Sequence, residues 1–162
     1  MVLDFEGSLR IAAEAPAIWQ ALLDPQSLIA CTPEIESLTA VEPGREYEGL
    51  ATVQFGSQRI SFPLRARWVE LEPERYGRLA AVIVAAGHQL KLHLNVTLTA
   101  DGGQQTELQW QAALRRPSSS DDESPSLLWQ LAANLARQRL EGFTRCLKAS
   151  LESGQLSVNS EQ

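Results

Sequence analysis

The sequence is poor in the residues that metal sites and disulfide frameworks require. Among its 162 residues it has two cysteines, Cys31 and Cys146, and two histidines, His88 and His93. The cysteines are far apart and belong to no Cys-x-x-Cys or Cys/His cluster, so the sequence signals neither a disulfide framework nor a zinc site. We expect both cysteines to be buried free thiols, because an unpaired cysteine usually packs as a small apolar side chain.

Recognisable catalytic patterns are also missing. His88 and His93 are five positions apart on one predicted strand, so their side chains point to opposite faces and cannot share a metal ion. The chain has no G-x-S-x-G turn, no P-loop and no dinucleotide-binding glycine pattern, and a His-assisted nucleophile would need one of these two histidines. We therefore predict no catalytic residues, no metal and no cofactor.

The chain lacks a basic excess and a long apolar run. Its 14 Lys and Arg residues are outnumbered by 20 Asp and Glu residues, and the formal net charge of −6 opposes binding to nucleic acid. Acidic Asp4 and Glu6 occupy the start, where a signal peptide needs basic residues, and no segment approaches the roughly 20 apolar residues that span a bilayer. We expect a cytoplasmic protein without a direct transmembrane anchor.

What is present is the composition of one folded domain. Hydrophobic residues make up 44% of the chain and charged residues 21%, as in ordinary soluble proteins. We predict a single domain over residues 1–152, followed by a polar tail over 153–162 that is disordered.

The order of hydrophobic patterns predicts an α+β fold. Alternation from Leu3 to Ile11 indicates a first strand, and two short helices follow, one from Pro16 to Asp24 and one from Pro25 to Cys31. Six further strands are separated by turn residues, and Leu128 to Leu151 form an apolar stripe at helical spacing. Residues 115–125 are polar and turn-rich, which predicts a mobile loop before this long helix.

One predicted strand differs from the others, because Leu79 to Ala86 is almost continuously apolar instead of alternating. Such a strand is covered on both faces, either by a neighbouring loop of the same chain or by a partner.

Several short stretches of the sequence resemble a known family. The stretches that carry the resemblance are Phe5-Glu-Gly-Ser, Ala15-Pro-Ala-Ile-Trp-Gln-Ala-Leu-Leu-Asp-Pro, Leu28-Ile-Ala-Cys-Thr-Pro, Leu71-Glu-Pro-Glu-Arg-Tyr and Val96-Thr-Leu-Thr-Ala-Asp-Gly-Gly. On these the chain resembles the CoxG-like family of carbon monoxide dehydrogenase subunits, within the START-like (SRPBCC, Bet v 1-like) superfamily, over about residues 3–151. The resemblance implies a helix-grip fold, in which a seven-stranded curved antiparallel sheet wraps around the long C-terminal helix, with the two short helices between strands 1 and 2.

The resemblance also implies a role. It implies a noncatalytic accessory protein that binds a lipophilic, lipid- or quinone-like molecule between sheet and helix and serves a molybdenum hydroxylase or a membrane-associated redox complex. The residues that we expect to line this pocket are Tyr47, Phe62, Trp68, His88, Leu92, Trp110, Leu135 and Phe143. Two alternatives stay open: a cyclase- or aromatase-like enzyme that uses His88 or Tyr47 as acid or base, and an interaction module whose pocket is filled by its own side chains.

Overall fold

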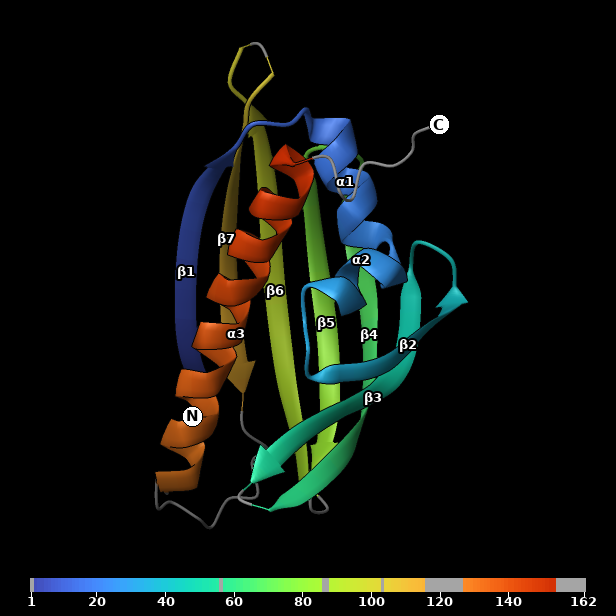
Figure 1. The fold of residues 1–162 in the computed structure, drawn as a ribbon, viewed down its shortest axis with the longest axis vertical. Coiled ribbons are helices and arrows are strands. Elements are labelled where there is room, and N and C mark those ends of the chain that lie inside the picture. Colours follow the sequence, from blue (N-terminus) through green and yellow to red (C-terminus); the bar gives the residue numbers. More distant parts are fainter. Residues whose placement is uncertain (1, 56, 86–87, 103, 116–126, 154–162) are drawn as a thin grey trace.

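The computed structural model of the chain describes residues 2–55, 57–85, 88–102, 104–115 and 127–153. Seven strands and three helices lie in these ranges (Figure 1). In chain order they are β1 (Val2–Ile11), α1 (Ala15–Leu23), α2 (Pro25–Ala30), β2 (Ile35–Glu42), β3 (Glu46–Phe55), β4 (Gln58–Glu72), β5 (Tyr76–Ala85), β6 (His88–Ala100), β7 (Thr106–Arg115) and α3 (Leu127–Glu152).

The seven strands form one antiparallel sheet in the order β1-β7-β6-β5-β4-β3-β2. β2 to β7 are therefore neighbours in sequence order, whereas β1 pairs with β7 at the far edge. α1 and α2 connect the two edge strands, β1 and β2. In Figure 1, β2 and β3 curve round toward the side of the sheet on which α3 lies. The predicted helix-grip fold is confirmed.

The short helices begin and end where local chemistry requires it. Pro16 lies in the first turn of α1, where a backbone N–H is not needed. Asp24 ends α1 in an extended conformation and caps α2, because its carboxylate accepts a hydrogen bond from the Gln26 backbone N–H at 3.1 Å. Only Asp24 therefore separates the two helices, and α2 lies against β2.

The main core lies between that end of the sheet, α1 and the last turns of α3. Ile11, Ile18, Leu108 and Leu147 are almost completely buried there, together with Trp19. The rings of Trp19 and Trp68 lie 6.3 Å apart between centroids, a distance at which aromatic pairs attract. This end of the molecule is closed by side chains of the protein itself.

The prediction of two free thiols was wrong. Cys31, at the C-terminal cap of α2, forms a disulfide with Cys146 of α3, and their Cα atoms are 5.5 Å apart. The cysteines are 115 positions apart in the chain, so only the folding of α3 across the sheet brings them together. Composition and spacing carry no signal of such a contact.

Some expectations fall beyond what is described. The loop predicted at 115–125 lies outside the described residues except for Arg115, and the tail predicted at 153–162 does so except for Ser153. Within the described parts of the chain, no helix is both long and apolar enough to cross a membrane.

Candidate functional site

The face of the sheet that α3 covers is buried unevenly, and this gradient defines the candidate site. At the α1 end, Leu98, Leu108 and Trp110 are at most 4% exposed. Toward the opposite end, Leu114 of β7 is still buried, at 4% exposed, but the inward-facing side chains of β4, β5 and β6 keep partial access to solvent. These half-buried residues are Phe62, Leu64, Ile83, Leu90 and Leu92. Ile60, at the far end of β4, is 37% exposed. We call the five half-buried residues the inner apolar row.

The register of the strands places the inner apolar row on one surface. Leu64 on β4 pairs with Ile83 on β5, and Ile83 pairs in turn with Leu90 on β6. Directly paired residues of adjacent strands point to the same face, so these side chains form a continuous apolar ladder across three strands. In Figure 1, α3 lies over the β1, β7 and β6 side of the sheet, which leaves β4 and β5 less covered.

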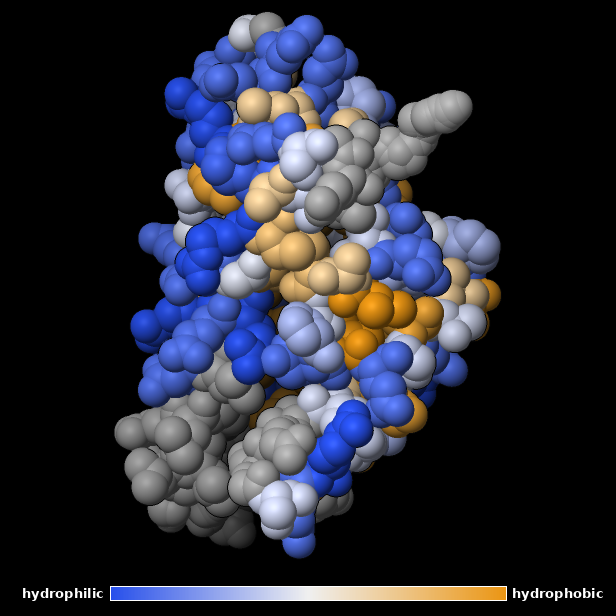
Figure 2. Space-filling model, viewed as in Figure 1, coloured by the Kyte–Doolittle hydropathy of each residue, from blue (hydrophilic) through white to orange (hydrophobic). Residues whose placement is uncertain are grey.

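Apolar side chains also reach the surface beside this face. Figure 2 shows an apolar patch where Figure 1 places α2 and β2. The half-buried residues of these two elements include Leu28, Ile29, Ile35 and Leu38. The inner apolar row and this patch together make the region between sheet and α3 suited to an apolar ligand.

Two predicted lining residues lie at the closed end. The Tyr47 hydroxyl donates a 2.7 Å hydrogen bond to the carbonyl of Leu23, the last residue of α1. Burial raises the pKa of Tyr47, and the Asp24 carboxylate acts in the same direction; the indole N–H of Trp68 acts against both, although the two groups do not reach hydrogen-bond geometry. Tyr47 and Trp68 are 1% and 3% exposed, so they hold α1 against the sheet.

Of the other predicted residues that are described, one lies in the core and three are half-buried. Trp110 is 3% exposed and lies against Gly7 of β1, where a Cβ atom would meet the indole ring at 2.7 Å. Phe62, Leu92 and Phe143 are half-buried, and the last two pack against the main core. The side chains of His88 and Leu135 lie outside the described residues.

The structure adds residues that the sequence analysis did not single out. Leu64, Ile83 and Leu90 lie between Phe62 and Leu92 on the inward face. The alternation of apolar residues along β4 and β6 is the sequence signal that could have identified Leu64 and Leu90. The predictions favoured aromatic side chains as pocket lining. Most of the aromatic side chains instead fill the core, whereas aliphatic ones line the accessible part.

Two links between α2, its following segment and α3 border the candidate site. The first is the Cys31–Cys146 disulfide, and the second is an ion pair in which Arg139 Nε lies 2.6 Å from a carboxylate oxygen of Glu34. Arg139 and Cys146 are seven positions apart, two helical turns, so both project from one side of α3. The segment between α2 and β2 is thereby fixed to the helix along two turns.

The polar chemistry of this face is limited in the part of the chain that is described. The Tyr47 hydroxyl is engaged by Leu23, and the buried Thr106 hydroxyl donates to the Ala13 carbonyl at 2.8 Å. Within the described ranges, no group of three or more His, Cys, Asp or Glu side chains is arranged to hold a metal ion.

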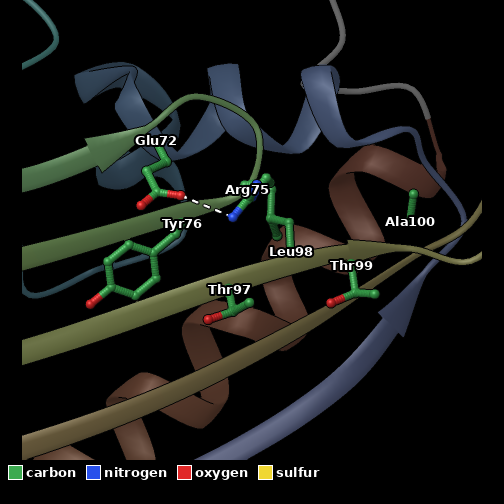
Figure 3. A pocket seen from close by; sticks show the side chains of 7 residues that line it. All are labelled: Glu72, Arg75, Tyr76, Thr97, Leu98, Thr99 and Ala100. Atoms are coloured by element: carbon green, nitrogen blue, oxygen red, sulfur yellow. Dashed lines mark ion pairs between the residues drawn. The ribbon is translucent and has the colours of Figure 1, made fainter.

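Two hollows lie on the opposite, outer side of the sheet. One has a volume of about 660 Å³ and is bordered by Glu72, Arg75, Tyr76 and the β6 residues Thr97 to Ala100 (Figure 3). Figure 3 shows the guanidinium of Arg75 pointing at the Glu72 carboxylate, with 3.1 Å between the paired atoms. The other hollow, of about 590 Å³, has Asp4, Glu6, Arg78, His93 and Asn95 among its lining residues. Both hollows carry charged side chains on their borders, unlike the inner apolar row.

Comparisons with known proteins agree with this geometry. Residues 7–151 match the model of the CoxG family, which is described as a subunit of carbon monoxide dehydrogenase. None of the curated protein sequences matches the chain.

Solved structures share the fold at low sequence identity. A conserved protein from Geobacillus kaustophilus has a TM-score of 0.78 and 13% identity, with 94% of this chain and 97% of that chain covered. An aromatase/cyclase from Streptomyces has a TM-score of 0.72 and 14% identity, with 94% of each chain covered. A START superfamily protein from Mycobacterium smegmatis has a TM-score of 0.64 and 15% identity, with 93% of this chain and 97% of that chain covered.

Proposed function

Because the chain belongs to the CoxG family of carbon monoxide dehydrogenase subunits, we propose that it is a noncatalytic accessory protein that binds a lipophilic molecule between its sheet and α3. The observation that carries this proposal is the inner apolar row. Its side chains point into the fold from three strands yet stay partly accessible, whereas the α1 end of the same face is sealed.

The chemistry of the row selects the class of ligand. Burial of apolar ligand surface against aliphatic and aromatic side chains is favourable by about 25 cal/mol per Å². The same side chains provide no hydrogen-bond partners for a charged or strongly polar molecule. A quinone-like ring or an acyl chain fits such a lining, and the polar end of the molecule would remain toward solvent.

A noncatalytic role agrees with the polar groups available. Of the two residues considered as acid or base, Tyr47 is 1% exposed, and its hydroxyl donates a hydrogen bond to the Leu23 carbonyl. A group held in this way is poorly placed to exchange a proton with a ligand. The side chain of His88 lies outside the described residues, so the proposal does not depend on it.

The proposed partner is a molybdenum hydroxylase of the carbon monoxide dehydrogenase type. The family's description as a dehydrogenase component supports this assignment. A lipophilic electron carrier bound beside a redox enzyme would pass electrons away from it, which gives the apolar site a purpose in that complex.

We place the protein in the cytoplasm, and the Cys31–Cys146 disulfide makes this part of the proposal testable. Cytosolic thiols are kept reduced, so a disulfide in that compartment is unusual. Rapid alkylation of thiols in intact cells, followed by mass spectrometry, reports the oxidation state; a fully oxidised pair in every cell would contradict a cytoplasmic location.

The ligand experiment uses the purified protein and two matched variants. Native mass spectrometry followed by organic extraction identifies any bound molecule, and titration with a short-chain quinone measures affinity. Ile83→Trp fills the inner apolar row, and Val84→Trp adds the same ring on the outer face, one residue away.

The two variants separate filling of the site from a general effect of tryptophan. We expect binding tighter than about 100 μM, roughly −5.5 kcal/mol, for wild type and Val84→Trp, and at least about tenfold weaker binding for Ile83→Trp. Absence of any lipophilic ligand in wild type, together with no binding of the quinone, would favour the interaction-module alternative instead.

A further inference from the structure

The outer face of the sheet carries a partly exposed apolar strip. The sequence singled out Leu79 to Ala86 as continuously apolar, and in the structure alternate residues of this run point outward. Outward-facing Val82 is half-buried and Val84 is 37% exposed. The described residues place no helix over this side of β5, because α3 lies on the other side of the sheet (Figure 1).

The strip continues onto the neighbouring strands. Leu50 on β3 pairs directly with Pro63 on β4, and both are exposed, Leu50 at 38%. Pro63 precedes Leu64, whose partner on β5 is Ile83, so the antiparallel register brings Pro63 opposite Val84. Leu50, Pro63, Val82 and Val84 therefore form one apolar strip across β3, β4 and β5.

A row of cations borders this strip. Arg65 on β4 pairs with Val82, Val82 pairs with Lys91 on β6, and Lys91 pairs with Arg115 on β7. Arg67 lies two residues beyond Arg65 on the same face, and all four cationic side chains are exposed. The cationic row is Arg65, Arg67, Lys91 and Arg115; it and the apolar strip together are called the basic–apolar face.

The charge of this face is opposite to that of the whole chain. Two acids accompany the row at its β3 edge: Glu48 lies 3.9 Å from Arg65, and Glu46 pairs in register with Arg67. Beyond β4, Lys91 and Arg115 pair with each other, and exposed Asp4 of β1 lies diagonally beside Arg115 on the same face. Their effect reaches His93, whose pKa is lowered mainly by burial and further by the charges of Arg115, Arg78 and Lys91. A protein of net charge −6 thus concentrates positive charge beside its exposed apolar strip.

We propose that the basic–apolar face is the docking surface for an acidic patch on the dehydrogenase partner. This inference rests on the proposed function, because it names where that partner binds. An apolar centre bordered by arginines is the composition of a protein interface, in which the planar guanidinium meets carboxylates in a bidentate geometry. A second copy of the chain is disfavoured on this face, since two cationic rows would oppose each other.

A protein surface also fits the shape of the face better than a membrane does. The apolar residues lie within the strands of the sheet, not at the tips of loops that could insert among lipids. Three of the four cations are arginines, the residue enriched at protein interfaces.

The test measures binding to the purified molybdenum hydroxylase by biolayer interferometry. One double variant, Lys91→Glu with Arg115→Glu, reverses charge on the basic–apolar face. The matched control, Arg137→Glu with Arg145→Glu, makes the same change in net charge at two exposed positions of α3. A third variant, Leu50→Ser with Val84→Ser, removes the exposed apolar surface. Uptake of the lipophilic ligand is measured for every protein.

We expect the Lys91/Arg115 variant to bind at least about tenfold more weakly than wild type, with a smaller salt dependence of association. The Leu50/Val84 variant should weaken binding too, whereas the α3 control should stay within about twofold. Ligand uptake by the Lys91/Arg115 and Leu50/Val84 variants should not change, because their substituted side chains lie on the outer face.

Equal weakening by both charge-reversed variants, or none by the Lys91/Arg115 variant, would overturn the proposal. The proposal would also be overturned if wild type did not bind the hydroxylase but bound vesicles of phosphatidylcholine and phosphatidylglycerol. That result would indicate that the face binds a membrane. Ligand uptake tests the proposed ligand-binding function independently of the docking proposal. If wild type takes up the ligand, that function is supported even when docking fails; if wild type takes up no ligand, that function is contradicted.

Discussion

Removal of the Cys31–Cys146 disulfide should destabilise the protein strongly. The bond joins the end of α2 to α3 beside the candidate site, and Cys31 is 5% exposed. The perturbation is made in two ways: reduction of the wild type with a phosphine, and the double substitution Cys31→Ser with Cys146→Ser. Each opens the same covalent loop.

The size of that loop sets the magnitude. Closing a loop of 115 residues in the unfolded chain removes about 16 cal/mol/K of entropy, which corresponds to roughly 4.8 kcal/mol at 25 °C. Native disulfides commonly contribute less than this limit, so we expect a loss of about 2–4 kcal/mol. For a chain of this size each kcal/mol lowers Tm by about 2–4 °C, so the melting temperature should fall by about 4–16 °C.

Urea unfolding followed by tryptophan fluorescence measures the change, since Trp19 and Trp68 report on the core. Wild type is compared with and without reductant, and the double serine variant serves as the internal control because reductant should not affect it. Wild type containing two alkylatable thiols under oxidising conditions would refute the reasoning. So would an intact disulfide whose reduction changes the free energy of unfolding by less than about 1 kcal/mol.

Three further predictions concern single side chains. Tyr47→Phe removes the donor to the Leu23 carbonyl and should lower the free energy of unfolding by about 1–2 kcal/mol in urea titrations, without changing ligand affinity. Gly77→Ala places a Cβ 2.7 Å from Trp68 and should lower the free energy of unfolding, measured by the same urea titrations, by about 1–3 kcal/mol. Gly142→Ala, whose Cβ meets nothing within 4 Å, should raise it by up to about 1 kcal/mol through helix propensity. Similar effects of the two substitutions would contradict the packing described. The pKa of Glu152 is lowered by hydrogen bonds from Lys148 and from the Ala12 backbone N–H. The ionised Glu152 carboxylate therefore stabilises the folded state above the unfolded-state pKa, near 4.5, and this stabilisation is lost as the pH falls through the lower folded-state pKa. Glu152→Gln should therefore unfold with a weaker pH dependence below about pH 4.5, as acid titrations followed by circular dichroism would show.

Most of the fold could be predicted because its signals are local. The period of two along Leu90, Leu92, Leu94 and Val96 identifies a strand with one buried face, and the structure places β6 there. Pro16 and Asp24-Pro25 act through their own backbone, so the limits of α1 and α2 followed from the sequence to within a residue or two.

Features that depend on distant contacts could not be predicted in this way. The alternation of side chains along the strands indicates that Tyr47 and Trp68 face inward. It does not indicate that α1 covers these two residues while Leu64 and Ile83 stay partly accessible. The disulfide depends on the same kind of information, because the positions of Cys31 and Cys146 are set by the docking of α3. Family resemblance supplied the architecture, whereas the distribution of burial on the inner face follows from how the helices pack against it.

The apolar run of β5 shows how one pattern can serve two surfaces. Ile83 points inward to the inner apolar row and Val84 points outward to the basic–apolar face, although they are adjacent in the chain. A buried strand would need both sides covered by the same domain, yet the described residues cover only the inner side. The outer side of the strand, where Val84 is 37% exposed, is therefore accessible for the proposed docking. Because the two faces share a strand but no side chain, polar substitution of Val84 should leave ligand affinity intact, and filling of the inner row at Ile83 should leave partner binding intact.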